Sequence, residues 1–224
     1  MMKKEKHPNT DPKTTLCTYI VIGPMPFPWK AFKRHLKDPK KYSKIKLFFV
    51  DGGHVHFEKL KKEAPFLIES AVTVGDGDST KVPMILKKKD QNLSDLAFFL
   101  GEMLKVKGIG SLYFLGFLGG RLDHELFNLG EIARFVEKTP AKSTPKITLN
   151  DTVEFLNSGT HLLDIDTLFS LASFTPNKIK IQGRCLYKLL KWTPLPVLSS
   201  LGLSNFGSGP VKIETKRPLA VILG

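Results

Sequence analysis

Apolar and polar positions divide the first two thirds of the chain into short apolar runs and longer amphipathic stretches. Residues 95–106 and 123–136 carry apolar side chains at a 3.6-residue period and predict amphipathic helices. A third helix-like stretch ends at about Lys62. The apolar runs stop at glycine or aspartate and predict four buried strands, at 18–22, 46–50, 71–74 and 112–115. Because right-handed crossovers join strands that alternate with helices, we expect a Rossmann-like, mostly parallel sheet in an α/β domain.

The pattern changes after about residue 145. Seven short apolar or β-branched segments there predict strands, at 146–149, 153–156, 162–165, 168–174, 178–181, 211–214 and 219–223. Turn residues separate them, most clearly at 157–159, 176–177 and 207–210. This spacing is typical of an antiparallel β-sandwich. We therefore expect three parts: a basic flexible tail at 1–17, an α/β domain at 18–150 and a C-terminal antiparallel β-sandwich domain at 151–224.

Composition narrows the class of protein. The chain has 224 residues, 42% of them hydrophobic and 25% charged, which is a globular composition. Residues 1–13 are polar and lysine-rich with no apolar core of a secretory signal, and no apolar run approaches membrane-spanning length. Cys17 and Cys185 form neither a C-x-x-C pair nor a dense disulfide framework. These features predict a reduced, cytoplasmic protein.

Positive charge is concentrated at the start of the chain. The net charge is +13, and residues 1–50 hold twelve lysines and arginines against three acidic residues. Such a segment can attract nucleic acid, anionic lipid or polyanionic substrates. The alternative is a solvated tail followed by the outer face of a basic helix around 29–41. We favour the second interpretation, because no base-stacking aromatic motif accompanies the charge.

Polar, glycine-rich segments follow the predicted strands. In an open parallel sheet, ligands bind outside the carboxyl ends of the strands. Four such segments fall at or near this edge, at 51–53, 75–79, 90–95 and 116–124. Each segment alone is a modest signal. Their convergence on one edge predicts the functional site.

Carboxylates in two of these segments suit a divalent metal. Asp76 and Asp78 lie two residues apart, so an extended backbone points both to one side, where their oxygens can bind Mg²⁺ on a phosphate. The alternative for this segment is an ordinary polar turn. Asp95 lies at a predicted helix start, where the macrodipole favours a charged third ligand. Its alternative is that Asn92, Ser94 and Asp95 only cap the helix.

The segment before the last predicted helix resembles a phosphate cradle. Gly119 and Gly120 allow backbone N–H groups to approach an anion, and Arg121 adds bidentate donors. Walker A and G-x-G-x-x-G patterns are absent from the sequence, which argues against a P-loop kinase and a common NAD enzyme. His124 could act as a general base, but a histidine on a helix face more often only packs or forms a hydrogen bond. Residues 87–89, three lysines, can help to hold phosphates, but we interpret them as solvated.

The motifs, taken in order, resemble those of the thiamine pyrophosphokinase family. That family carries an Asp-Gly-Gly turn, a G-D-x-D-S motif, a D-x-x-x-[ST]-D motif and a G-G-R-x-D-H motif, which here read at 51–53, 75–79, 90–95 and 119–124. Residues 168–171 and 202–205 also resemble its F-S-L strand and S-N turn. The similarity extends from about residue 18. Gly77 replaces a bulky apolar residue, and the G-L-K-[WY] segment matches only in part, so either Tyr187 or Trp192 is the candidate to stack on thiamine.

The resemblance implies a homodimeric enzyme that transfers pyrophosphate from Mg-ATP to the hydroxyl of thiamine, giving thiamine diphosphate and AMP. Thiamine would lie near the dimer interface, against the sandwich domain of the partner. Mg²⁺ would be held by Asp76, Asp78 and Asp95. The residues implied for ATP are Asp51, Ser79, Asp90, Gln91, Ser94 and Arg121. Gln91, Arg121 and Asp123 would organise the phosphates and the reacting hydroxyl, and those implied for thiamine are Trp192, Ser204 and Asn205.

Three other functions stay open, the last of which is nucleic-acid binding driven by the basic first 50 residues. One is a pyrophosphokinase with another alcohol acceptor, such as a hydroxymethylpterin, because the G-L-K-[WY] segment matches only in part. Another is a nucleotide- or thiamine-binding protein without turnover. Retention of Asp76, Asp78, Asp95, Arg121 and Asp123 argues against a decayed site.

Overall fold

The computed structural model describes residues 16–36, 44–78, 82–140 and 144–224. All but the last two residues of the expected tail at 1–17 lie outside this part of the chain, as does Ser79. The predicted basic helix begins at Trp29 as α1 (Trp29–His35), and residues 37–41 of that prediction also lie outside it.

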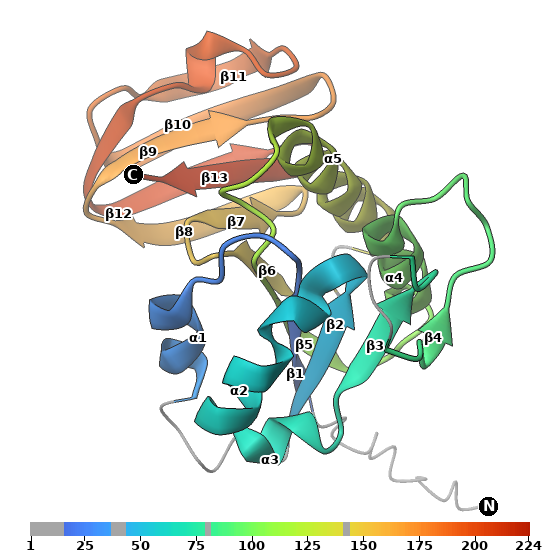
Figure 1. The fold of residues 1–224 in the computed structure, drawn as a ribbon. Coiled ribbons are helices and arrows are strands. Elements are labelled where there is room, and N and C mark those ends of the chain that lie inside the picture. The colour runs from blue at the N-terminus through green and yellow to red at the C-terminus, as the bar shows by residue number, and fades with distance from the viewer. Residues whose placement is uncertain (1–15, 37–43, 79–81, 141–143) are drawn as a thin grey trace, which may run out of the picture.

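Six parallel strands form the first half of the sheet (Figure 1). Their spatial order is β6 (Lys146–Leu149), β5 (Ile109–Leu115), β1 (Cys17–Ile22), β2 (Ile45–Val50), β3 (Val72–Gly75) and β4 (Leu86–Lys87). In the centre of the sheet, Val21 lies beside Phe48 on one side and Phe114 on the other. The mostly parallel α/β arrangement is confirmed. The two-residue edge strand β4 was not predicted.

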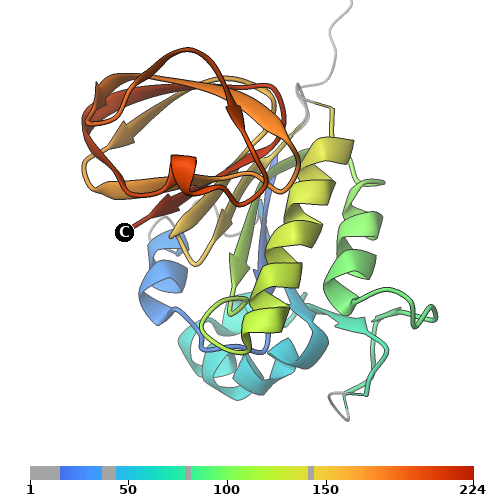
Figure 2. The same cartoon turned by 90° about the horizontal axis from the view of Figure 1, so that it is seen from above.

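Helices cover both faces of the parallel strands, as Figure 2 shows from above. One face carries α1, the short helix η2 (Asp51–His56), α2 (Phe57–Glu63) and α3 (Pro65–Ile68), and the other carries α4 (Asp95–Met103) and α5 (Leu122–Lys138). Each face has its own apolar core, around Phe32, Phe49 and Leu60 on the first and Phe99, Phe114 and Phe135 on the second. The predicted helices are confirmed. Helix α4 ends at Met103 because Lys105 and Val106 donate to carbonyls three residues back, in tighter turns.

The C-terminal strands pair antiparallel, as predicted. They are β7 (Val153–Leu156), β8 (Gly159–Ile165), β9 (Leu168–Ala172), β10 (Asn177–Cys185), β11 (Leu189–Leu195), β12 (Asn205–Thr215) and β13 (Leu219–Leu223). They enclose a separate apolar core that includes Phe169, Ile179 and Ile213. Strand β7 also pairs with β6, so the described strands form one continuous 13-stranded sheet. The division into an α/β domain and a sandwich domain at residue 151 therefore stays a prediction.

One prediction about the C-terminal half is wrong, and one strand there was not predicted. Residues 207–210, predicted as a turn, lie inside the long strand β12. A Cβ on Gly207 would lie 2.4 Å from the carbonyl oxygen of Ile165, so this glycine serves a close approach between strands. The sequence around Leu189–Leu195 was not recognised as a strand, and it forms β11 beside β10. Within the described residues, no helix has the length and apolar character needed to cross a membrane.

Candidate active site

The loops after β1 and β5 meet where the strand order reverses. The backbone N–H of Gly23 donates to the carbonyl oxygen of Leu115 (2.9 Å), and that of Met25 donates to Gly116 (2.9 Å). A Cβ on Gly23 would lie 2.5 Å from the oxygen of Gly116. This switch point is where open α/β sheets bind ligands.

The Asp-Gly-Gly turn after β2 packs against the end of β1. Asp51 has a φ of 55°, an uncommon conformation for a residue other than glycine. A Cβ on Gly53 would lie 2.1 Å from the carbonyl oxygen of Ile22, so only glycine allows this contact. Asp51 follows the last residue of β2 and therefore lies at the carboxyl edge of the sheet.

A buried lysine joins two of the predicted carboxylates. Nζ of Lys88 lies 3.0 Å from Oδ2 of Asp76 and 2.9 Å from Oδ1 of Asp95, and it donates a 2.8 Å hydrogen bond to the carbonyl of Leu93. The side chain of Lys88 is only 6% exposed. A Cβ on Gly75 would lie 2.3 Å from Oδ2 of Asp95, so the glycine leaves room for this carboxylate. The expectation that residues 87–89 are solvated is therefore wrong at Lys88.

Burial and ion pairing shift the pKa values of these three groups differently. A hydrogen bond from the backbone N–H of Asp78, and then the contact with Lys88, lower the pKa of Asp76 to about 2. Burial raises the pKa of Asp95, although Lys88 opposes the shift. Burial also acts to lower the pKa of Lys88, but Asp95 and Asp76 outweigh it, so that pKa is raised. For Asp95, burial thus outweighs the helix N-terminus, which on its own favours the charged form.

The other residues predicted around this edge are more exposed. Oδ1 of Asp90 accepts a 2.9 Å hydrogen bond from the backbone N–H of Asn92, and Gln91 is exposed beside them. Ser94 caps α4 by accepting from Ala97 N–H (3.1 Å), which confirms the capping interpretation for this residue. Asp78 is exposed. Among the described residues, no three His, Cys, Asp or Glu side chains are arranged to hold a metal, so the expected trio of aspartates is not assembled here.

The residues present nevertheless suit a divalent cation. Oδ1 of Asp95 is fully buried and receives no hydrogen bond from the described residues, although Nζ of Lys88 makes an ion pair with it. Carboxylate oxygens are the ligands that Mg²⁺ prefers. Asp76 and Asp95 therefore fit a magnesium site that nucleotide phosphates would complete.

A glycine-rich turn before α5 forms the second part of the site. Its backbone N–H groups, from Gly119 and Gly120, donate to Oε1 of Glu125 at 2.9 and 2.7 Å. These donors thus hold the protein's own carboxylate, and their contact with a phosphate stays a prediction. Arg121 forms a two-point ion pair with Asp123, with Nη2 2.6 Å from Oδ2. The hydrogen bond from Arg121 lowers the pKa of Asp123, and both side chains are exposed.

The predicted thiamine residues do not all lie together. Asn205 is buried, and its side chain hydrogen-bonds both the N–H and the C=O of Tyr187 (2.9 and 2.7 Å). Tyr187 is 61% exposed and lines a pocket of about 500 Å³ with Leu203 and Asn205. Ser204, next to it, has a φ of 57° and donates its N–H to Oγ of Ser170. Trp192 lies elsewhere on β11, with two lysine ammonium groups on its ring, from Lys180 (4.8 Å) and Lys216 (4.3 Å).

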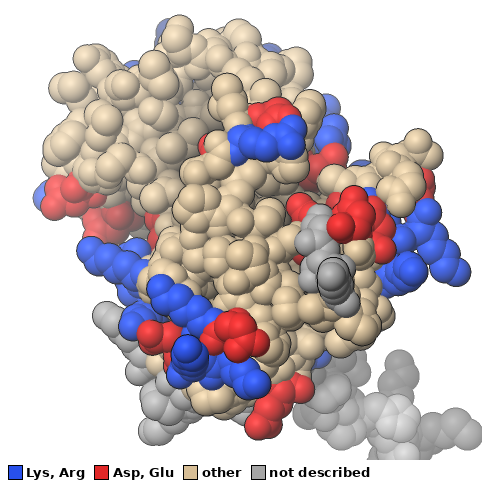
Figure 3. All heavy atoms as spheres, in the orientation of Figure 1, with Lys and Arg blue, Asp and Glu red and all other residues tan. Residues whose placement is uncertain are grey.

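The surface near this pocket is unusually apolar. Its exposed side chains include Leu186, Leu190, Leu201, Leu203 and Phe206, each 47–67% exposed. Figure 3 shows few charged side chains over the C-terminal strands on the face in view. An apolar surface of this kind is typical of a binding face.

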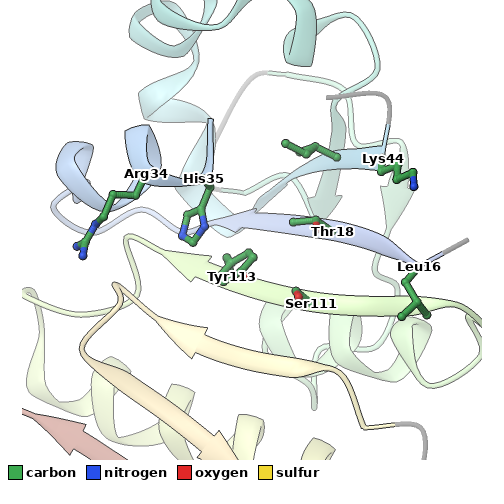
Figure 4. Close-up of a pocket in the computed structure, with 8 residues that line it drawn as sticks. Leu16, Thr18, Arg34, His35, Lys44, Ser111 and Tyr113 are labelled. Atoms are coloured by element: carbon green, nitrogen blue, oxygen red, sulfur yellow. The ribbon is translucent and has the colours of Figure 1, made fainter. Parts of the chain in front are cut away.

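A separate hollow lies over β1 and β5, nearer the amino ends of these strands (Figure 4). It has a volume of about 450 Å³, and its lining includes Thr18, His35, Ser111 and Tyr113. The His35 ring packs on Tyr113 with 3.8 Å between centroids, and its Nε2 lies 3.2 Å from Oδ1 of Asp151. The two cations at its rim, Arg34 and Lys44, point away from its centre (Figure 4). The hollow does not gather groups for a charged ligand.

Solved structures share this architecture over almost its whole length. Thiamine pyrophosphokinase from Bacillus subtilis superposes with a TM-score of 0.63 at 18% identity, covering 92% of this chain and 98% of that one. The chain has the fold of the thiamine pyrophosphokinases. The enzyme from Geobacillus thermodenitrificans gives a TM-score of 0.65 at 17% identity over 93% of this chain and 98% of that one. The enzyme from Candida albicans gives 0.63 at 12% identity over 96% and 95%.

No family model matches the sequence, and no curated protein matches it either. The solved structures confirm in the fold the resemblance found in the motifs.

Two contacts at the site were not predicted. Lys88 sits in a run of three lysines that is typical of a solvated segment, and Glu125 carried no signal beyond its place in the first turn of a helix.

Proposed function

We propose that this protein is a thiamine pyrophosphokinase, which transfers the β,γ-pyrophosphoryl group of Mg-ATP to the hydroxyl of thiamine and releases AMP. The observation that carries the proposal is the Asp76–Lys88–Asp95 cluster at the carboxyl edge of the sheet, on a fold shared with these enzymes. The motif resemblance supports the same reaction. The proposal includes a cytoplasmic location.

The ATP phosphates are proposed to lie between the cluster and the turn before α5. Asp76 and Asp95, with Asp78 at the rim, would hold Mg²⁺, which supplies charge neutralisation for the phosphates when bound. Gly119 and Gly120 would donate their N–H groups to phosphate oxygens once Glu125 gives up that position. Further polar contacts to the nucleotide are proposed from Asp51, Ser79, Asp90, Gln91 and Ser94.

Arg121 and Asp123 are proposed to act on the reacting groups. The Arg121 guanidinium is exposed and can turn from Asp123 to the phosphates, where its charge offsets the negative charge that develops. Asp123 can accept a hydrogen bond from the thiamine hydroxyl as it attacks the β-phosphorus. Asp123 is exposed, and a solvated carboxylate is only a weak base, so it orients the hydroxyl more than it takes its proton.

The pocket beside Tyr187 is proposed as part of the thiamine site. Tyr187 offers an exposed ring there, and Asn205 holds the Tyr187 backbone through two hydrogen bonds. Ser204 precedes Asn205 in the chain. Trp192 is the weaker candidate, because a cationic thiazolium would meet two lysines already on its ring. The apolar surface around the pocket supports a homodimer that covers it. A protein that sediments as a monomer at micromolar concentration would contradict this part.

Substitution of Arg121 tests the assignment of the site. We expect Arg121→Ala and Asp78→Ala each to reduce thiamine-dependent AMP formation by at least ~10²-fold, as for other preorganised electrostatic groups. Arg134→Ala is the matched control, because Arg134 makes a similar ion pair with Glu131 further along α5. AMP formation at the wild-type rate in both site variants would rule out these roles.

A further inference from the structure

Lys88 reaches the carboxylates because β4 adds an edge strand next to β3. Leu86 and Lys87 pair with Val74 and Gly75, and the backbone N–H of Lys88 donates to the carbonyl of Gly75 (2.8 Å). This pairing fixes the lysine backbone directly beside the start of the Asp76 segment. Its neighbours Lys87 and Lys89 are exposed, whereas Lys88 is buried. The edge strand thus delivers one ammonium group to the centre of the candidate site.

The ammonium group contacts the carboxylate oxygens that a metal would need. Oδ2 of Asp76 and Oδ1 of Asp95 both face Nζ of Lys88. Of the other two oxygens, Oδ1 of Asp76 accepts from Asp78 N–H (3.1 Å), and Oδ2 of Asp95 lies on the side of Gly75. A cation that bridges Oδ2 of Asp76 and Oδ1 of Asp95 therefore competes with Lys88 for these two oxygens. The ammonium also compensates charges that would otherwise be buried and unpaired.

We propose that Lys88 is a positioning residue that acts as the internal counter-ion of the nucleotide-free site. It holds Asp76 and Asp95 side by side and keeps the pair from binding a free divalent cation tightly. The metal then enters with the nucleotide, whose phosphate oxygens supply the ligands that the occupied carboxylates do not. Mg²⁺ dehydrates reluctantly and commonly binds through one or two carboxylates plus substrate phosphates, which suits this order. The inference rests on the proposed function, in which the site takes Mg-ATP.

Binding of Mn²⁺ without nucleotide tests this role directly. Free Mn²⁺ is titrated at pH 8 into the full-length wild type, Lys88→Met and Lys87→Met, and followed by electron paramagnetic resonance. We expect weak binding by the wild type and by Lys87→Met, which loses the same charge from the neighbouring exposed position. Lys88→Met should bind Mn²⁺ at least about tenfold more tightly, because a unit charge in contact with the pair has been removed. The gain should disappear in Lys88→Met/Asp95→Asn.

Each outcome of the Mn²⁺ titration supports or overturns the proposed role of Lys88 without a measurement of enzymatic turnover. A merely structural lysine predicts that its loss weakens Mn²⁺ binding, so an unchanged or lower affinity in Lys88→Met overturns the proposal. If circular dichroism shows that Lys88→Met does not fold, Lys88→Gln takes its place in the same titration. Tight binding of Mn²⁺ by the nucleotide-free wild type overturns the proposal without any variant. Failure of thiamine turnover would instead count against the proposed function, since Mn²⁺ binding requires no acceptor.

Discussion

At the residue scale, the candidate site contains internal partners for both kinds of charge that Mg-ATP carries. Lys88 places an ammonium on the carboxylates of Asp76 and Asp95, and Glu125 places a carboxylate on the N–H groups of the glycine turn. Buried or preorganised polar groups are costly when they are left unpaired. These contacts therefore keep the nucleotide-free site in a defined geometry.

The depressed pKa of Asp76 predicts a specific dependence of stability on pH. The pKa falls from 3.8 to about 2 in the folded protein, so the ionised carboxylate stabilises the fold fully above about pH 4. That contribution is lost as the pH falls toward 2. We expect Asp76→Asn to be less stable than the wild type at pH 6 and to lose less of its stability between pH 4 and pH 2. Urea unfolding across this range measures both; parallel pH profiles for the two proteins would contradict the assignment.

At the element scale, the segments with a clear apolar pattern were predictable from the sequence, and the strands at the two ends of the sheet, β4 and β11, were not. Strands at 146–149, 153–156 and 219–223 have the predicted bounds, because each is a short, mostly buried run rich in apolar residues. β4 has two residues and no periodicity of its own. Since β4 is what buries Lys88, the sequence could not distinguish this lysine from its exposed neighbours. β11 was missed because Lys191 and Pro194 interrupt its apolar pattern.

Two glycines differ in what the fold requires of them. In Gly53→Ala the new Cβ would lie 2.1 Å from the Ile22 backbone oxygen, so the Asp-Gly-Gly turn must move. We expect a loss of about 1–3 kcal/mol or more in the free energy of unfolding. In Gly130→Ala, in α5, the new methyl group would meet no described atom within 4 Å apart from its chain neighbours and the backbone of its own helix, and the variant should gain about 0.5–1 kcal/mol. Denaturant unfolding compares them, and equal stabilities would show that the turn is not constrained as described.

At the scale of the whole molecule, the carboxyl edge of the parallel strands gathers the motifs that are scattered along the sequence. Topology explains why this was predictable: β2, β3 and β5 run parallel, so the segments that follow them emerge on one side. The aromatic residue of the proposed thiamine site was less predictable, because Tyr187 and Trp192 are only five residues apart but lie in different surroundings. Trp192 lies within β11, whereas Tyr187 lies between β10 and β11.

The measurement that tests the central claim most directly is the product analysis of purified protein incubated with Mg-ATP and thiamine. Attack on the β-phosphorus predicts AMP and thiamine diphosphate in equal amounts, with neither product formed when thiamine is omitted. ADP together with thiamine monophosphate would contradict pyrophosphoryl transfer. AMP that appears only with a different alcohol would contradict thiamine as the acceptor.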